Sequence, residues 1–185
     1  MDAQAVRDRR SEFESIFATE DRFRAWYDVA ARRLYAYLVG RCGGDGALAE
    51  ELTQQSFVLA VKARDTFDGR SDPITWLIAI GRNRLVDHLR REEREERRRL
   101  RLVVREIAPS TIDNVGWIPD DRAEVLRVLR RLPASQRSVL ILHHVDGLPV
   151  RQIAIMLERT EGAVEALLSR GRARFREIYG EVGHG

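Results

Sequence analysis

The sequence predicts an all-α protein made of two small helical domains, and three observations support this. Apolar residues recur every three or four positions along most of the 185-residue chain. Breaks rich in glycine and proline separate these periodic segments. Near the middle, residues 108–119 contain two prolines, one glycine and no clear period, so they divide the helices into two groups. A hydrophobic fraction of 44% is sufficient for a core in each group.

The central helix is expected over residues 71–99. Ser71 or Asp72 can cap its start, and Pro73 suits the first turn because its missing N–H would have no partner there. One apolar stripe should be buried, whereas a second stripe begins aromatic and ends polar and cationic. The second stripe is either simply solvated or meets nucleic acid. The apolar stripe comprises Ile74, Leu77, Ile78, Gly81, Leu85 and Leu89, and the second comprises Trp76, Ile80, Asn83, Asp87, Arg90 and Arg94.

Two helices are expected before the central one, over residues 23–39 and 47–64, with a glycine-rich break between them. The second has a polar side that is either plain solvent-exposed surface or a docking face for a protein. The polar loop 65–72 could cradle an unstacked base, with arginine side chains nearby. Residues 1–20 form a short helix or a frayed tail, to which we assign no function. The polar side consists of Glu50, Glu51, Gln54 and Gln55.

Four helices are expected after the break, over residues 122–131, 134–145, 149–157 and 162–179. The last two are joined by a four-residue turn in which Thr160 is a natural cap. Two short helices joined in this way, the second outwardly basic, are typical of a helix-turn-helix that reads the major groove.

Composition excludes several classes of protein. A single cysteine, Cys42, rules out an internal disulfide, and the four histidines show no metal-ligand spacing. No phosphate loop or nucleophile motif is present, so we expect no enzyme, catalytic residue, metal site or cofactor. No apolar run approaches the ~20 residues of a membrane span and no signal peptide is visible, which predicts a cytoplasmic protein without membrane insertion.

Basic residues cluster although the net charge is only +3. Residues 82–105 hold ten arginines against five acids, whereas residues 106–121 hold four acids and no base. Codon bias in a GC-rich genome explains most of the preference for arginine over lysine, but it does not explain the clustering. Arginine suits phosphate and base edges because its guanidinium is a planar fork.

Two blocks of the sequence resemble one family. Phe23–Tyr27, Ala49–Phe57 and Trp76–Arg91 are similar to region 2 of extracytoplasmic-function sigma factors. Leu132–Arg137, Gln152–Ala154, Glu161–Val164 and Arg170–Arg174 are similar to region 4. The resemblance covers roughly residues 23–179, and both blocks in this order are more specific than either alone. It implies an N-terminal extension at 1–20, region 2 at 21–99, a linker at 100–121, region 4 at 122–180 and a tail at 181–185.

The resemblance implies a transcription initiation factor that joins core RNA polymerase, directs it to promoter DNA and has an anti-sigma factor as partner. Three sets of residues correspond to its binding surfaces. Core polymerase binding falls on Glu50, Glu51, Leu52, Gln54 and Gln55. Reading and opening of the −10 element falls on Arg70, Ser71, Trp76, Asn83, Asp87, Arg90 and Arg91. Reading of the −35 element falls on Glu165, Ala166, Ser169 and Arg170, with Arg151, Thr160, Arg172 and Arg174 mainly at phosphates.

The sequence departs from the family pattern at several positions. Glu165 and Leu167 stand where many relatives carry basic residues, and Glu158 begins a turn that commonly contains glycine. Glu165 should repel phosphate but could accept a hydrogen bond from a cytosine amino group. The acidic linker, with Asp113, Asp120 and Asp121, would imitate RNA in the polymerase channel. The alternative is a two-domain helix-turn-helix regulator that acts without polymerase, which leaves the Gln54 and Asn83 blocks without a role.

Overall fold

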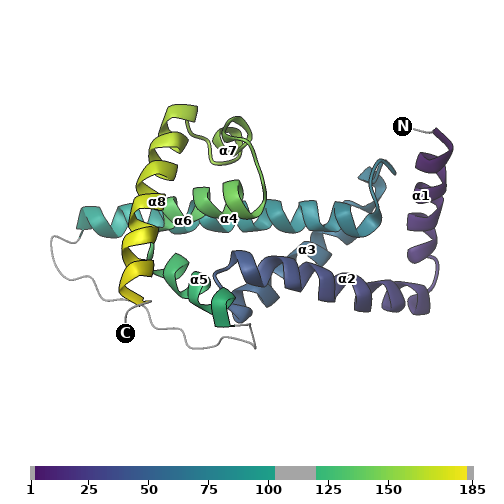
Figure 1. Ribbon diagram of the computed structural model, residues 1–185. Helices are drawn as coiled ribbons and strands as arrows, with labels where there is room; N and C mark the ends of the chain where they lie inside the picture. Colours follow the sequence, from purple (N-terminus) through teal and green to yellow (C-terminus); the bar gives the residue numbers. More distant parts are fainter. Residues whose placement is uncertain (1–2, 103–119, 183–185) are drawn as a thin grey trace. The chain divides into compact units, whose positions relative to one another are not determined.

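The computed structural model describes residues 3–102 and 120–182 (Figure 1). Within these ranges the secondary structure is entirely helical, which confirms the all-α prediction. The described residues form two compact units. The N-terminal unit covers residues 3–42 and 46–85, and the C-terminal unit covers 43–45, 86–102 and 120–182. None of the described helices is long and apolar enough to cross a membrane.

The N-terminal unit packs its helices around a leucine-rich core. The close approach of two helices is visible at Gly81, where an added Cβ would come within 2.6 Å of Leu34 Cδ1. The helices of this unit are α1 (Ala3–Ile16), α2 (Glu20–Arg41), α3 (Gly46–Lys62), the 3-10 turn η1 (Arg64–Thr66) and the first part of α4 (Pro73–Leu102). Its buried residues include Ala30, Leu34, Leu38, Ala49, Phe57, Leu77 and Leu85.

The start of the sequence, predicted to be either a short helix or a frayed tail, forms the helix α1. Its only buried residues are Phe13 and Ile16, which join Phe67 in a small core of their own. Half-buried rings surround that core and are contributed by Phe17, Phe23, Trp26 and Trp76. The first residues of the chain are therefore a helix held by long-range aromatic packing rather than by their own weak apolar pattern.

Helix α4 begins as its sequence predicts. Asp72 is the cap, because its Oδ1 accepts hydrogen bonds from the backbone N–H of Ile74 at 2.8 Å and of Thr75 at 3.3 Å. The helix runs on to Leu102, three residues beyond the predicted end. Its residues from Val86 onward belong to the C-terminal unit, where Val86 is part of the core.

The C-terminal unit surrounds a second core. Arg137 pairs with Glu92 of α4, and Glu96 Oε2 accepts from the N–H of Ala134 at 3.0 Å. The elements of this unit that follow α4 are α5 (Asp120–Arg131), α6 (Ala134–Leu140), the π-helical segment η2 (Ile141–Val145), α7 (Val150–Met156) and α8 (Glu161–Val182). Its core includes Val128, Val139, Ile141, Leu142, Ile153, Val164, Leu168 and Ile178.

The structure revises two predictions about these helices. Residues 134–145 were expected to form one helix, but the last turn widens so that the N–H of Asp146 reaches the carbonyl of Ile141. Leu100–Leu102 and Asp120–Asp121, predicted as linker, are helical ends of α4 and α5. The rest of the predicted linker lies outside the described residues.

Candidate nucleic-acid interface

The loop before α4 is fixed by its own side chains. Asp68 Oδ1 accepts from the N–H of Arg70 at 3.0 Å, and Asp72 caps α4 two residues further on. Gly69 has φ +72°, a conformation that glycine adopts without a Cβ penalty. Arg70 is exposed and Ser71 is half-buried, so this loop presents a cationic side chain to solvent.

Trp76 does not point freely toward solvent. Its ring meets Phe13 edge-on at 5.3 Å between centroids and Phe67 at 5.6 Å. These distances are typical of stabilising aromatic pairs. Trp76 therefore packs against the rings at the start of the loop, and only part of its own ring is accessible to solvent.

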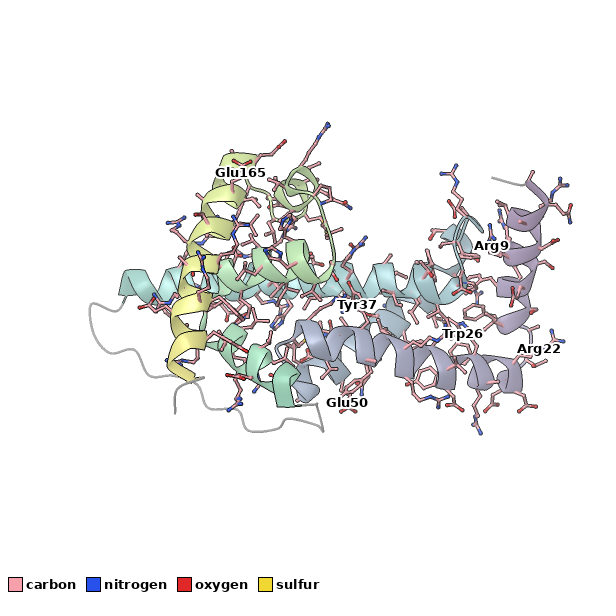
Figure 2. All side chains as sticks on the ribbon, in the orientation of Figure 1. Arg9, Arg22, Trp26, Tyr37, Glu50 and Glu165 are labelled. Carbon is pink, nitrogen blue, oxygen red and sulfur yellow. The ribbon has the colours of Figure 1, made fainter. Side chains whose placement is uncertain are left out.

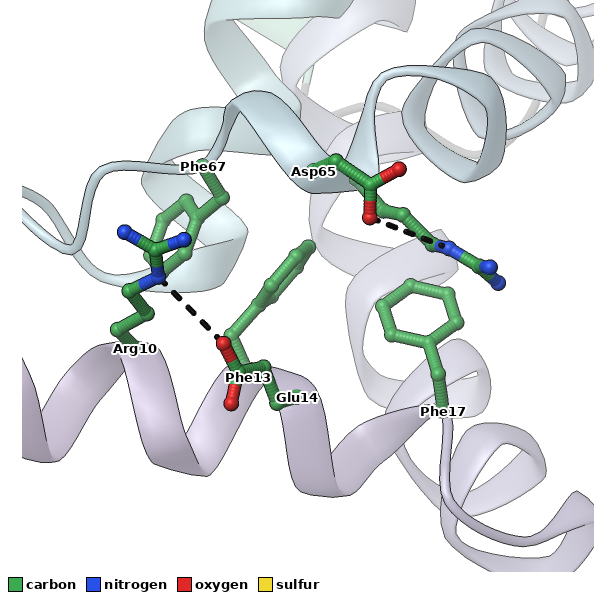
Figure 3. Close-up of a pocket in the computed structure, with 7 residues that line it drawn as sticks. Arg10, Phe13, Glu14, Phe17, Asp65 and Phe67 are labelled. Carbon is green, nitrogen blue, oxygen red and sulfur yellow. Dashed lines mark hydrogen bonds and ion pairs between the residues drawn. The ribbon is translucent and has the colours of Figure 1, made fainter.

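A pocket of about 290 Å³ opens between α1 and the segment that leads into the loop (Figure 3). Arg10 pairs with Glu14 at 3.4 Å on one wall, and Arg64 pairs with Asp65 at 3.7 Å on the other. Rings together with guanidinium groups are what an unstacked base and its phosphate require. The rings are those of Phe13, Phe17 and Phe67.

The predicted −10 residues on α4 differ in their exposure to solvent. Asn83 and Arg91 are exposed, whereas Asp87 and Arg90 are half-buried. Arg90 is engaged, because its Nη1 lies 3.9 Å from Asp87 and 3.2 Å from Glu158. Of these four residues, Asn83 and Arg91 are thus the more accessible to solvent.

Helix α8 presents its predicted reading side to solvent. Its exposed Arg170 and Arg176 each donate a hydrogen bond from Nε to the carbonyl of the residue one turn earlier, at 3.2 and 3.3 Å. Leu167 is buried in the core, so its side chain is not part of the exposed surface of α8. Figure 2 shows Glu165 near the start of α8, pointing away from the helix. The exposed set comprises Glu165, Ala166, Ser169, Arg170, Arg172 and Arg174.

The turn between α7 and α8 has the form expected of a helix-turn-helix. Thr160 Oγ1 accepts from the N–H of Ala163 at 3.2 Å, which confirms the predicted cap. Glu158 has φ +52°, a left-handed conformation that is uncommon for a residue other than glycine. Arg159 Nη2 lies 2.5 Å from Glu93 Oε2, and Glu93 is only 3% exposed. Arg151 is exposed on α7.

His144 lies close to Arg172 of α8 and is influenced by its charge. Burial lowers the pKa of His144, and the neighbouring charges of His143 and Arg172 lower it further. His143 Nδ1 lies 2.9 Å from the carbonyl oxygen of Leu148, so that ring is held by the loop after η2.

The polar side of α3 is exposed at four of the five predicted docking residues, namely Glu50, Glu51, Gln54 and Gln55. Leu52 is the exception, because it is 3% exposed and packs in the core. Two valines that the sequence reading did not assign to this surface extend it, with Val58 55% and Val61 41% exposed. The spacing of Gln54, Val58 and Val61 puts all three on one side of the helix.

Residues 26–95 match the family model for sigma-70 region 2, and residues 122–175 match the model for sigma-70 region 4. The chain belongs to the sigma-70 family. Its relatives include the ECF RNA polymerase sigma factor BldN of Streptomyces coelicolor, 32% identical over 80% of this chain and 56% of that protein. The ECF sigma factor SigX of Bacillus subtilis is 26% identical over 82% of this chain and 80% of its own length. With these relatives the chain falls in the extracytoplasmic-function (ECF) group.

The chain covers only part of some relatives, and it shares its fold with a solved sigma-factor structure. This sigma-70 chain spans about a third of an uncharacterized Rhizobium meliloti protein, R00370, to which it is 35% identical, and just over half of BldN. A solved complex of the sigma factor RpoE with the anti-sigma factor NepR from Bartonella quintana shares its fold. The TM-score is 0.50 at 23% identity, over 86% of this chain and 97% of that chain.

Proposed function

We propose that this ECF chain is an alternative sigma factor that binds bacterial core RNA polymerase and directs promoter recognition, melting and transcription initiation. The observation that carries the proposal is that one chain has both region 2 and region 4 and keeps a potential DNA surface exposed on each. Such a factor acts at the chromosome, which places it in the cytoplasm. It needs no cofactor and no catalytic residue of its own.

The proposed work of the loop and α4 is strand opening at the −10 element. Separating bases costs a few kcal/mol for each one that leaves the stack. Stacking on aromatic side chains returns ~1–3 kcal/mol per base, which offsets that cost. Of the rings that line the pocket, we propose that the half-buried Phe17 makes this contact, because Phe13 and Phe67 are buried. Arg70 of the loop and Asn83 of α4 are exposed in the N-terminal unit and would hold the unpaired strand.

The proposed work of α8 is reading intact −35 duplex in the major groove. Arg170 and Ser169 would contact base edges, and Arg172 and Arg174 would contact phosphates. Glu165 repels phosphate, so we propose that it accepts from a cytosine amino group and makes the −35 preference unusual.

Run-off transcription with purified bacterial core polymerase tests the proposal. The template is a library of duplex promoters in which the −35 and −10 elements are randomised, and the transcripts are sequenced. A sigma factor yields RNA from a subset with a shared sequence. A regulator without sigma activity yields none, and the proposal then fails.

The α3 surface is tested by changing Glu51→Ala together with Gln54→Ala. Because both side chains are exposed, the pair should weaken core polymerase binding without unfolding the chain. The matched control is Gln4→Ala with Glu12→Ala, which removes the same residue types from an exposed position on α1. Undiminished core binding by the α3 variant would discard this assignment.

The α8 surface is tested by Arg170→Ala. If Arg170 contacts a base, promoter binding weakens by ~1–3 kcal/mol and the preference relaxes at one −35 position. Arg176→Ala is a close control, because Arg176 is exposed on the same helix with the same contact to a helix carbonyl. Equal effects of the two changes on sequence preference would refute a base contact.

Two further parts of the assignment are also proposals. We propose an anti-sigma protein as a partner, on the model of the RpoE–NepR complex. We also propose that the acidic linker occupies the RNA channel until the transcript displaces it. Unchanged initiation and promoter escape after neutralising Asp113, Asp120 and Asp121 would count against the linker role.

A further inference from the structure

Helix α1 lies outside the residues that match region 2, yet it packs on the loop proposed to read the −10 element. Most of its side chains are exposed. Arg7, for example, donates to the carbonyl of Ala3 at 3.4 Å. Besides its packing on α2, α1 makes three contacts with the segment between Phe67 and Trp76.

Two of these contacts fix the backbone of Gly69. Arg9 Nε donates a hydrogen bond of 2.8 Å to the Gly69 carbonyl, and Arg9 is half-buried. On the opposite side of the same residue, the Val6 carbonyl lies so close that any Cβ at Gly69 would collide with it. Gly69 is therefore held by α1 in its left-handed conformation, one residue before Arg70. Figure 2 shows Arg9 on α1, close to this loop.

The third contact fixes the base of the loop. The Phe13 ring lies 4.3 Å from that of Phe67 and 5.3 Å from that of Trp76, measured between centroids. Phe13 is buried, so α1 contributes the centre of the ring cluster that bridges the start of the loop and the first turn of α4.

We propose that α1 is a positioning element for −10 recognition, acting through Arg9 and Phe13 on the loop rather than by contacting DNA with these two residues. Arg9 holds the Gly69 carbonyl, which sets the direction in which Arg70 and Ser71 leave the loop. Phe13 holds Phe67 and Trp76, which sets the shape of the adjacent pocket. This inference rests on the proposed sigma activity and adds a specificity determinant outside the family's region 2.

The test compares Arg9→Ala with Arg7→Ala in the promoter library, using the full chain and core polymerase. The readout is the base-preference ratio, defined as transcripts from the most favoured base over the least favoured at the most selective −10 position. Arg9→Ala removes the charged donor on α1 that binds the Gly69 carbonyl of the loop. The base-preference ratio should therefore fall roughly three- to tenfold. Arg9→Lys should restore part of it. Arg7→Ala removes the same charge two residues away and should leave it unchanged.

The outcomes separate positioning from simple loss of folded protein. Loss of folded protein lowers transcription from all promoters equally and leaves the ratio intact. If Arg9→Ala does only that, or if Arg7→Ala lowers the ratio as much, the inference is overturned while the proposed function stands. Core binding, measured in parallel, should stay within about twofold of the parent chain, because Arg9 is far in sequence from the α3 surface. If the parent chain starts no RNA at any promoter, the proposed function itself fails.

Discussion

The loop before α4 and the turn between α7 and α8 are both short connections that must keep one shape, but different forces hold them. The loop is held by packed rings and by a glycine whose φ is +72°. The turn is held by ion pairs, with Arg159 on Glu93 and Glu158 on Arg90. Its left-handed residue is a glutamate rather than a glycine. The loop also accepts a hydrogen bond from Arg9, but it contains no ion pair as close as that of Arg159 with Glu93. It should therefore respond less to salt than the turn does, and more to side-chain volume.

The largest expected effect comes from Phe13→Ala, which breaks the ring cluster. Because Phe13 is 2% exposed, its loss leaves a cavity between the loop and α4 and should destabilise the N-terminal unit by about 3–5 kcal/mol. Denaturant unfolding followed by fluorescence reports it, since Trp26 and Trp76 lie in that cluster. Phe17→Ala is the control, because Phe17 is only half-buried and should cost less. Equal losses from the two changes would contradict a cluster centred on Phe13.

A smaller effect is expected from Glu93→Gln, which removes the charge that holds the turn. Arg159 Nη2 and Arg97 Nη2 lie 2.5 and 3.2 Å from Glu93 Oε2. Losing the charge-assisted part of these bonds should cost the C-terminal unit about 1.5–3 kcal/mol. Hydrogen exchange of amides in α7 and α8 measures this locally.

Glu95→Gln is the matched control for Glu93→Gln, because Glu95 is exposed on the same helix. It should change stability by less than about 0.5 kcal/mol. If the protection of α7 and α8 falls equally in both variants, net charge rather than the Arg159 contact explains the result. If it falls in neither, the turn does not depend on Glu93.

The contrast also explains what the sequence could predict. Caps are local, so Asp72, Thr160 and the breaks around them follow from neighbouring residues. The burial of Leu52 and the exposure of Val61 do not follow from neighbouring residues, because which side of α3 is buried depends on how it packs against α2. The role of α1 was missed for the same reason. Phe13 is far in sequence from Phe67 and Trp76, and one small group of large apolar residues, Phe13, Ile16 and Phe17, in a charged segment gives no hint that they meet.

The site was predictable to a similar extent. The exposed residues of α8 followed from helical period alone, and the structure places Glu165, Ser169 and Arg170 on its surface as expected. The pairing of Arg90 with Glu158 did not follow, because Arg90 lies on α4 and Glu158 lies in the turn after α7, far apart in sequence. Whether these surfaces bind DNA and polymerase stays a prediction that the transcription experiments address.

The smallest effect is expected from Glu158→Gly, which replaces the ion-paired turn with one that resembles the loop. Two backbone bonds end α7 around this residue: the N–H of Arg159 donates to the Ala154 carbonyl at 2.9 Å, and that of Glu158 to the Ile155 carbonyl at 3.3 Å. This pattern places a left-handed residue at Glu158, where glycine avoids a cost of roughly 1–2 kcal/mol.

Against that gain stands the loss of the pair with Arg90, in which the Glu158 side chain is 73% exposed. An exposed pair contributes about 0–1 kcal/mol and is screened by salt. Glu158→Gly should therefore stabilise the C-terminal unit by about 0.5–1 kcal/mol, measured by the same amide exchange, and by more at high salt, where the lost pair counts for less. Glu158→Gln separates the terms, because it removes the charge and keeps the backbone strain, so it should be neutral or slightly destabilising. Both variants lack the pair with Arg90, so if Glu158→Gly is no more stable than Glu158→Gln, relief of the backbone strain contributes nothing and this prediction is wrong.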